Sequence, residues 1–432
     1  MALGARAAQP AAQGVVEATV ERIGDHGDGI AETPRGRLYI PFTVPGDRVR
    51  ARPLRPKGDG FAAECVALLA QGPGRQEPPC AHFGRCGGCS LQHLTDDAYA
   101  VWKRERLQRA LDRAGFGDTV PSPLVRSPPG TRRRARFAVR RLRGQNVVAG
   151  FNVRDGHTVV DVQACPVLEP QIIALLAPLR QVMTELLAPG QATEVTATLL
   201  TGGLDVLLDW PVAPGHAALE RLARFAAAAD VARLSWRRSG AVVTEPVVQQ
   251  GQVGALFAGR FVAVPPAGFL QATAASEAAL VAAVRHGIGP APAVADLFCG
   301  AGTFTFPLHK AGARVHAVDA DAASVAALAA AARGLPHLST AVRDLMRRPL
   351  LPAELDRFDA VVLDPPRAGA QAQVTELARS RLPLVVYVSC NPASFARDAR
   401  ILREGGLAMR CVTPVDQFLW SEHLELVAVF GR

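Results

Sequence analysis

The chain has almost no lysine, no long apolar run and no internal repeat. The lack of a long apolar run argues against a membrane-spanning helix. No stretch of the 432 residues stays apolar for the roughly 20 positions that a membrane helix needs. The first residues, 1–13, are rich in alanine but contain no apolar segment of the kind found in signal peptides. We therefore expect a cytoplasmic protein with no membrane partner.

The basic charge of the chain is carried almost entirely by arginine. Only three of the 48 basic residues are lysines, yet the formal net charge is +9. A positive balance of this size favours an anionic partner, and nucleic acid is the first candidate. The length suggests about three domains.

Eight cysteines are present, and a cytoplasmic chain seldom uses them for disulfides. Cys80, Cys86 and Cys89 follow the spacing C-x5-C-x2-C in a glycine-rich loop, and Cys165 is the candidate fourth ligand. Four thiolates suit either zinc or a four-iron cluster, and the spacing does not choose between them. Radical enzymes usually have C-x3-C-x2-C, which this spacing does not match.

The first two-thirds of the chain divides into a small barrel and a mixed α/β region. Residues 14–69 alternate apolar and polar positions between glycine turns, which is typical of a β-barrel. The segments 27–31 and 39–47 resemble a TRAM domain, an OB-like barrel of RNA-modifying enzymes, and such barrels bind nucleic acid on an open face. Residues 70–265 form the mixed region. Within it we predict a basic helix over 96–114 and an arginine patch over 132–136, either a phosphate-contacting surface or an ordinary solvated face.

Residues 266–432 alternate strands and helices, which predicts a doubly wound parallel sheet. We expect strands at 293–298, 313–319, 339–344, 359–364, 384–389, 409–415 and 424–430, and a helix at 322–333. Ligands of such sheets bind at the carboxyl ends of the strands.

Cys390 stands at one of these strand ends. The apolar residues before Ser389 predict a buried strand, while Asn391 and Pro392 predict a helix N-cap and first helical position. The positive end of that helix would favour thiolate over thiol at Cys390. The alternative is a small buried core cysteine.

Two further strand ends carry a candidate cofactor site. Residues 296–304 contain a glycine turn that opens a helix, and Asp319 ends the next strand, where an acid can hold a ribose diol. The pair resembles a class I S-adenosylmethionine methyltransferase; a dinucleotide site is the alternative, but the third glycine of its motif is replaced by Thr305. Asp364 opens a Pro-Pro turn that is similar to the D-P-P-Y turn of amino-group methyltransferases. Here Arg367 replaces the aromatic residue, and an amine needs no cysteine, whereas an unactivated uracil carbon does.

Taken together, these motifs resemble the RNA uridine 5-methyltransferase family, and most closely its ribosomal-RNA member with a TRAM domain and a four-iron cluster. The similarity also takes in 269–271, 417–418 and 423–425. The resemblance implies an S-adenosylmethionine-dependent enzyme in which Cys390 is the nucleophile and Glu425 the proton acceptor. It implies cofactor contacts by Gln271, Phe298, Thr303, Asp319, Asp344 and Asp364, and cluster ligation by Cys80, Cys86, Cys89 and Cys165.

The chain departs from the family at four positions, where Thr273, Thr303, Asp319 and Leu419 replace Asn, Asn, Glu and Pro. The RNA itself is not identified by any residue: ribosomal RNA is favoured by the barrel and the cysteines, and the T-loop of transfer RNA is the alternative. A catalytically inactive, cluster-bearing RNA-binding protein is the alternative of another class. We expect a monomer.

Overall fold

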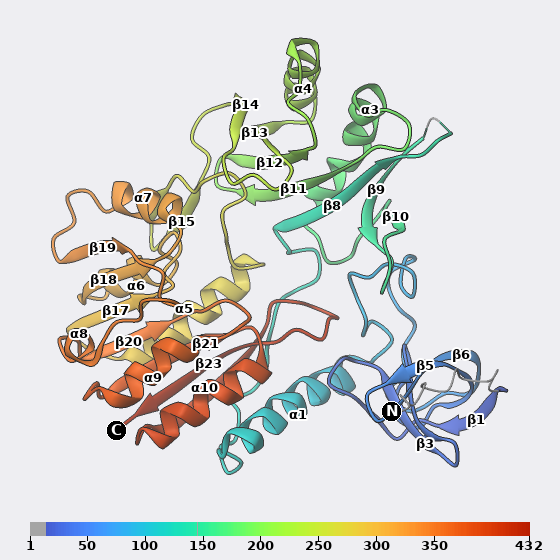
Figure 1. The fold of residues 1–432 in the computed structure, drawn as a ribbon, viewed down its shortest axis with the longest axis horizontal. Helices are drawn as coiled ribbons and strands as arrows, with labels where there is room; N and C mark the ends of the chain where they lie inside the picture. Colours follow the sequence, from blue (N-terminus) through green and yellow to red (C-terminus); the bar gives the residue numbers. More distant parts are fainter. Residues whose placement is uncertain (1–13, 145) are drawn as a thin grey trace, which may run out of the picture. The chain divides into compact units, whose positions relative to one another are not determined.

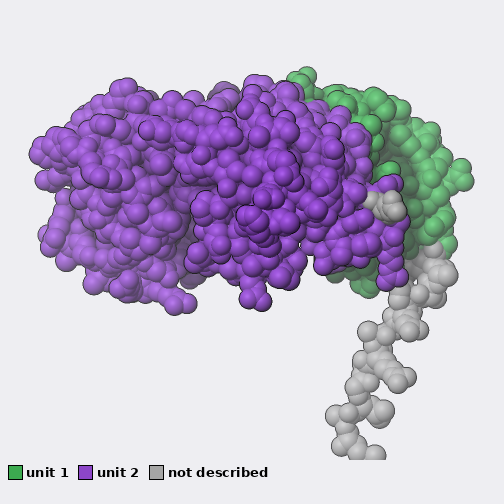
Figure 2. Space-filling view, turned by 90° about the horizontal axis from the view of Figure 1, so that it is seen from above, with its two compact units in different colours: residues 1–103, 420–422 green, residues 104–419, 423–432 purple. Residues whose placement is uncertain are grey.

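The computed structural model describes residues 14–144 and 146–432, and it separates into two compact units (Figure 2). Unit 1 comprises the described part of 1–103 together with 420–422, and unit 2 comprises 104–419 and 423–432. The alanine-rich residues 1–13, for which we predict no targeting segment, lie outside the described residues. Within the described ranges, every helix is too short or too polar to cross a membrane.

Unit 1 contains the six-stranded sheet β1-β5-β6-β4-β3-β2 (Figure 1). Its strands are β1 (Val16–Thr19), β2 (Arg22–Ile23), β3 (Gly29–Thr33), β4 (Gly36–Ile40), β5 (Arg48–Lys57) and β6 (Gly60–Ala70). β1 and β2 are two parts of one strand that changes partner at Val20: the Val20 amide donates to Asp47, beside β5, and the Glu21 amide donates to Ile30 in β3. Both edges of the sheet are thereby paired through one strand, and the sheet closes into the predicted barrel.

The barrel is filled by small and branched apolar side chains. On β5, buried Val49 and Ala51 alternate with exposed arginines, as a sheet with one buried face requires. They pack with Val20, Leu38 and Ile40 from the neighbouring strands. The outward-facing arginines of β5 alternate with this core, and one of them, Arg52, pairs with Glu64 of β6 (3.5 Å).

The helix predicted over 96–114 is present as α1 (Asp96–Ala114), which runs from unit 1 into unit 2. Within unit 2, its residues Leu107, Ala110 and Leu111 are fully buried against the sheet that carries Cys390. A basic helix of the predicted kind would expose Lys103, but this side chain is instead buried, with its ammonium group 5.2 Å from the ring centre of Tyr99. The prediction was wrong at this position because helical spacing does not tell on which side a neighbouring element packs.

The middle of unit 2 is a seven-stranded sheet with the order β10-β9-β8-β11-β12-β13-β14. Its strands are β8 (Arg134–Arg141), β9 (Val147–Asn152), β10 (Val159–Asp161), β11 (Ala192–Leu200), β12 (Gly203–Trp210), β13 (Val231–Arg238) and β14 (Glu245–Gln249). The helices α2 (Pro170–Ala174), α3 (Leu176–Leu186) and α4 (His216–Ala228) cover one face, burying Phe137, Val195 and Trp236. The mixed α/β character predicted for this region is confirmed.

The last part of unit 2 is an eight-stranded sheet with the order β19-β18-β17-β20-β21-β23-β22-β7. Its strands are β7 (Val125–Arg126), β17 (Ala293–Leu297), β18 (Arg314–Asp319), β19 (Leu338–Val342), β20 (Ala360–Leu363), β21 (Leu384–Ser389), β22 (Ala408–Asp416) and β23 (Glu425–Gly431). The hairpin β15 (Ala255–Phe257) and β16 (Arg260–Val262) precedes it. β17 to β21 are parallel and only β23 pairs antiparallel with its neighbours, so the predicted doubly wound sheet is confirmed.

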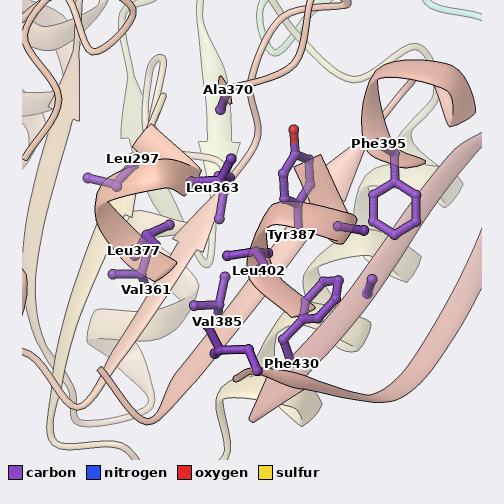
Figure 3. Close-up of a cluster of buried hydrophobic side chains, with 14 of the residues drawn as sticks. Leu297, Val361, Leu363, Ala370, Leu377, Val385, Tyr387, Phe395, Leu402 and Phe430 are labelled. Carbon is purple, nitrogen blue, oxygen red and sulfur yellow. The ribbon is translucent and has the colours of Figure 1, made fainter. Parts of the chain in front are cut away.

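Helices cover both faces of this sheet, and its central strands are therefore mostly apolar, with the buried Asp296 of β17 as an exception. They are α5 (Ala274–Ile288), α6 (Thr305–Lys310), α7 (Ala322–Ala331), α8 (Pro352–Leu355), α9 (Gln371–Arg379) and α10 (Pro392–Glu404). On the face of α9 and α10, Tyr387, Phe395 and Phe430 pack together (Figure 3). On the other face, Val386 and Val388 pack against α5. This two-sided burial explains why the strand before Cys390 could be predicted with its observed bounds.

Candidate active site

Three side chains meet at one edge of the eight-stranded sheet because of its strand register. Leu363 of β20 pairs with Tyr387 of β21, and Ser389 of β21 pairs with Leu426 of β23. The next positions outward are Asp364, Cys390 and Glu425. Because β23 runs antiparallel, its first residue lies at the edge where the parallel strands end. The sheet thus brings together three residues that the sequence analysis placed in the site.

The turn after β21 forms as predicted. The Asn391 side chain accepts a hydrogen bond from the Ala393 amide (3.1 Å), and Pro392 is the first residue of α10. The Asn391 amide group and the Ser394 hydroxyl both donate to the Arg367 carbonyl, at 2.9 and 3.0 Å. These contacts tie the Pro-Pro turn after Asp364 to the start of α10, directly after Cys390.

The surroundings of Cys390 favour the neutral thiol over the thiolate. Burial, followed by the negative charges of Glu425 and Asp364, raises its pKa from 9.0 to about 12, and Arg367 opposes the shift. The prediction that the helix N-terminus favours a thiolate was therefore wrong, because desolvation and two carboxyl groups outweigh a partial positive charge. Attack by Cys390 requires a base that takes its proton.

The two carboxyl groups beside Cys390, of Glu425 and Asp364, differ in solvent exposure, but the pKa of each is raised. Glu425 is 4% exposed, whereas Asp364 keeps some contact with solvent. Burial raises the pKa of both, and the charge of Asp364 raises that of Glu425 further. Glu425 Oε2 is buried and has no hydrogen-bond partner among the described residues. A carboxyl group in this state is suited to accept a proton near neutral pH.

Two glutamine side chains connect the carboxyl groups. Gln271 Nε2 donates to Asp364 Oδ2 (3.0 Å), and Gln271 Oε1 accepts from Gln417 Nε2 (2.9 Å). Gln417 Nε2 also donates to Glu425 Oε1 (2.8 Å). The sequence analysis assigned Gln271 to the cofactor and gave Gln417 no role. Two signals pointed to it: the family resemblance, which takes in 417–418, and its position one residue beyond a strand at the active edge.

The predicted cofactor turn lies between β17 and α6. Phe298, Gly300 and Gly302 all have positive φ angles, of 61°, 53° and 104°. A Cβ atom at Gly302 would lie 2.8 Å from the Phe306 ring, so glycine is required there. Asp319 Oδ2 accepts a hydrogen bond from the Gly300 amide (2.9 Å), which ties the turn to the end of β18.

The residues around this turn fit S-adenosylmethionine. Asp296 is fully buried, Thr305 donates to its Oδ2, and its Oδ1 has no partner among the described residues. Burial raises the Asp296 pKa to about 7. A cationic amino group such as the one that S-adenosylmethionine carries would satisfy the open oxygen. We did not predict a cofactor role for Asp296, because a residue inside a buried strand is usually part of the core.

The remaining predicted cofactor residues have local contacts. Thr303 is buried within the turn. Asp344 accepts a hydrogen bond from the Met346 amide (3.0 Å), which is typical of an aspartate in a turn. β19 accordingly ends at Val342, two residues earlier than predicted. Thr273, which replaces the family's Asn, caps α5 by accepting from the Ser276 amide (3.0 Å). No cofactor contact of Thr303 or Asp344 is established by these interactions.

The predicted cluster ligands are divided between the units: Cys80, Cys86 and Cys89 belong to unit 1 and Cys165 to unit 2. The described residues contain no group of three or more His, Cys, Asp or Glu side chains arranged as metal ligands. The Gly88 amide donates to Cys86 Sγ (3.4 Å), a contact that would also stabilise a thiolate. The steps at the active site are therefore described without a cluster.

The arginine patch over 132–136 is largely used within unit 2. Arg133 forms an ion pair with Glu277 of α5 in which both side chains are about 15% exposed, and Arg134 donates to the Ala267 carbonyl (3.0 Å). The Arg132 guanidinium lies 5.5 Å from the ring centre of Phe418. Only Arg136 is exposed, and it pairs with Glu194. A free phosphate-contacting patch was thus the wrong interpretation for Arg133 and Arg134, which hold the middle sheet to the sheet with Cys390.

The comparisons with known proteins agree with this geometry. The sequence profile of the family described as tRNA (Uracil-5-)-methyltransferase matches residues 268–431. An uncharacterized RNA methyltransferase of Brucella suis is 45% identical, over 96% of this chain and 97% of its own length. A 23S rRNA (uracil(1939)-C(5))-methyltransferase of Chromohalobacter salexigens is 35% identical, over 96% of this chain and 89% of its own. The fold is similar to that of Pyrococcus abyssi tRNA (uracil-54, C5)-methyltransferase in complex with S-adenosyl-L-homocysteine (TM-score 0.75, 22% identity, 96% and 100% coverage).

Proposed function

Because this chain belongs to the RNA (uracil-5-)-methyltransferase family, we propose that it methylates carbon 5 of a specific uridine through a covalent bond between Cys390 and the base. The observation that supports this most directly is the meeting of Cys390, Asp364 and Glu425 at one sheet edge, where a neutral thiol faces two carboxyl groups of raised pKa. S-adenosylmethionine, when bound, supplies an electrophilic methyl group on its sulfonium.

The first step is attack of Cys390 on the ring. The sulfur forms a bond to carbon 6 of the uracil, and the carbon 5–carbon 6 electron pair moves toward oxygen 4 to give an enolate. Because the pKa of the thiol is about 12, its proton must leave as the bond forms, and we assign Asp364 as the acceptor. Carbon 5 of the enolate is then nucleophilic enough to take the methyl group.

The second half of the reaction belongs to Glu425. Its unpartnered Oε2 takes the proton from carbon 5, the ring double bond forms again, and the bond from carbon 6 to Cys390 breaks. The sulfur recovers a proton and the methylated uridine leaves. The target base must be outside any helix stack for these contacts to occur.

The substrate is proposed to be 23S ribosomal RNA, with transfer RNA as the alternative. The relative from Chromohalobacter salexigens supports the first, and the fold of the Pyrococcus abyssi protein does not decide between them. The test is transfer of a labelled methyl group to unmodified ribosomal and transfer RNA, followed by mapping of 5-methyluridine. Label in neither RNA would favour the inactive RNA-binding protein.

Three further properties of the chain are proposed on sequence grounds. We propose that Cys80, Cys86, Cys89 and Cys165 hold a four-iron cluster, supported by their spacing and by the amide contact to Cys86. We treat 14–69 as a TRAM-type RNA-binding barrel, 70–265 as the cluster-bearing domain and 266–432 as the methyltransferase domain. The protein is proposed to act as a cytoplasmic monomer.

A further inference from the structure

Gln417 is a buried polar side chain that the proposed reaction does not use. It is 2% exposed and follows β22 directly, beside the first residue of β23. Its Oε1 accepts a hydrogen bond from the Ala272 amide (2.7 Å), while its Nε2 donates to Glu425 (2.8 Å) and Gln271 (2.9 Å). One side chain therefore uses its carbonyl and both of its amide hydrogens at the centre of the site.

The orientation of this amide is determined by its surroundings. The Ala272 amide can only donate, so it must face the Gln417 carbonyl oxygen. In the opposite orientation, Gln417 Nε2 would face the Ala272 amide nitrogen, so that two donors would meet. Gln417 Oε1 would then face two acceptors, Glu425 Oε1 and Gln271 Oε1. Gln417 is thus locked with its donors toward Glu425 and Gln271.

The same lock determines the orientation of Gln271. Because Gln271 Oε1 receives a donor from Gln417, its Nε2 must point the other way, toward Asp364. Each end of the connection Glu425–Gln417–Gln271–Asp364 therefore presents an N–H group to a carboxyl oxygen. A donor at a carboxylate stabilises the ionised form, which is the form that acts as a base.

We propose that Gln417 is a positioning residue of the methyl-transfer site, which fixes both amides so that Glu425 and Asp364 each receive a donor and are available as bases. This inference rests on the proposed function. In this proposal Gln271 supports the base Asp364 through its donor, in addition to the cofactor contact that the family resemblance implies. Gln417 does not touch the reacting atoms and acts through Glu425.

The charged groups around Glu425 determine what a change at Gln417 would do. Asp364 comes from the end of β20 and Cys390 from the end of β21, while Arg367 acts on Cys390 from the turn after Asp364. Among the described residues, no cation shifts the pKa of Glu425, and the hydrogen bond from Gln417 is the contact that lowers it. Removing that donor should raise the pKa of Glu425 further, so proton removal from carbon 5 should need a higher pH.

The test measures how fast the covalent RNA adduct resolves in single-turnover reactions from pH 6 to 9.5. Gln417→Met keeps the length of the side chain but loses both donors. We expect its midpoint to move up by about one pH unit, with resolution about tenfold slower at pH 7 and within about twofold of the wild-type rate at pH 9. An unchanged midpoint, or a rate reduced equally at every pH, would overturn the proposal.

A matched control is available in the same unit. Gln373 of α9 is also fully buried and makes two hydrogen bonds, to the amide (2.9 Å) and carbonyl (3.2 Å) of Leu350. Gln373→Met removes a buried amide away from the site, so it should lower the melting temperature without moving the pH midpoint; a moved midpoint would overturn the inference. If Gln417→Met does not fold, Gln417→Glu retains an acceptor for Ala272 but cannot donate to both neighbours, and its midpoint should also rise. Failure of wild-type enzyme to form any adduct would refute the proposed function instead.

Discussion

The raised pKa of Cys390 predicts that its reactivity toward alkylating agents is low, mainly because of burial, and is reduced further by Glu425. The shift from 9.0 to about 12 corresponds to about a thousandfold less thiolate at any pH well below 9. Since only the thiolate is alkylated, Cys390 of wild-type enzyme should react with iodoacetamide slowly at pH 7, and its rate should still be rising at pH 10.

Glu425→Gln should increase this rate, but only where Glu425 is ionised. The carboxyl group has a raised pKa, so near pH 6 it is protonated and the substitution removes no charge. At pH 9 to 10 the wild-type carboxylate repels the forming thiolate, and its removal should accelerate alkylation by about tenfold, equivalent to one pKa unit. The sign of the pH dependence is therefore specific: equal rates at low pH and a faster variant at high pH.

The assay is timed alkylation followed by peptide mass spectrometry. Cys411 of β22 is an internal control, because its pKa is raised by burial with no contribution from Glu425. Its rate should be the same in both proteins. An alkylation midpoint for Cys390 below pH 8, or no acceleration by Glu425→Gln at pH 9.5, would refute the description of the site as a neutral thiol beside two carboxyl groups.

Three other predictions follow from the site and the sequence. Cys390→Ala should form neither adduct nor product, whereas Glu425→Gln should accumulate methylated RNA bound to Cys390, seen as a slowly migrating band on denaturing gels; normal turnover of Glu425→Gln would remove it from the mechanism. Protein purified without oxygen should contain iron and absorb broadly in the visible range, and stoichiometric zinc without iron would exclude the cluster. Arg133→Met leaves Glu277 buried without its partner and should cost about 3 kcal/mol of stability, measured by denaturant unfolding. The exposed Arg136 is the contrast: Arg136→Gln should leave stability unchanged, weaken RNA binding and reduce the salt dependence of that binding.

Much of the fold could be predicted from the sequence where a local pattern carried the information. β21 was predicted with its observed bounds because both of its faces are buried, and the start of α10 because Asn391 and Pro392 act within one helical turn. The meeting of Cys390 and Glu425 at one sheet edge could be predicted from the strand ends together with the family resemblance, whereas Asp364 was assigned to the cofactor.

The parts that were missed depend on contacts between distant segments. The ionisation of Cys390 could not be predicted because two of the groups that raise its pKa, Asp364 and Glu425, lie on other strands. The role of Gln417 depends on a backbone amide 145 residues away. Arg133 looked like a surface charge until α5 supplied Glu277.

The antiparallel direction of β23 has a consequence for engineering and for natural variation in length. Gln417 and Glu425 stand at the two ends of one hairpin connection, anchored by the pairing of Val415 with Glu425. An insertion or deletion between them would change the spacing of an amide and the acid it supports. Turns at the opposite edge of the sheet, such as the one at Gly405–Gly406 between α10 and β22, carry no such pair. Random insertion libraries should therefore recover active enzymes with altered lengths at that distant turn and none with altered lengths between Gln417 and Glu425.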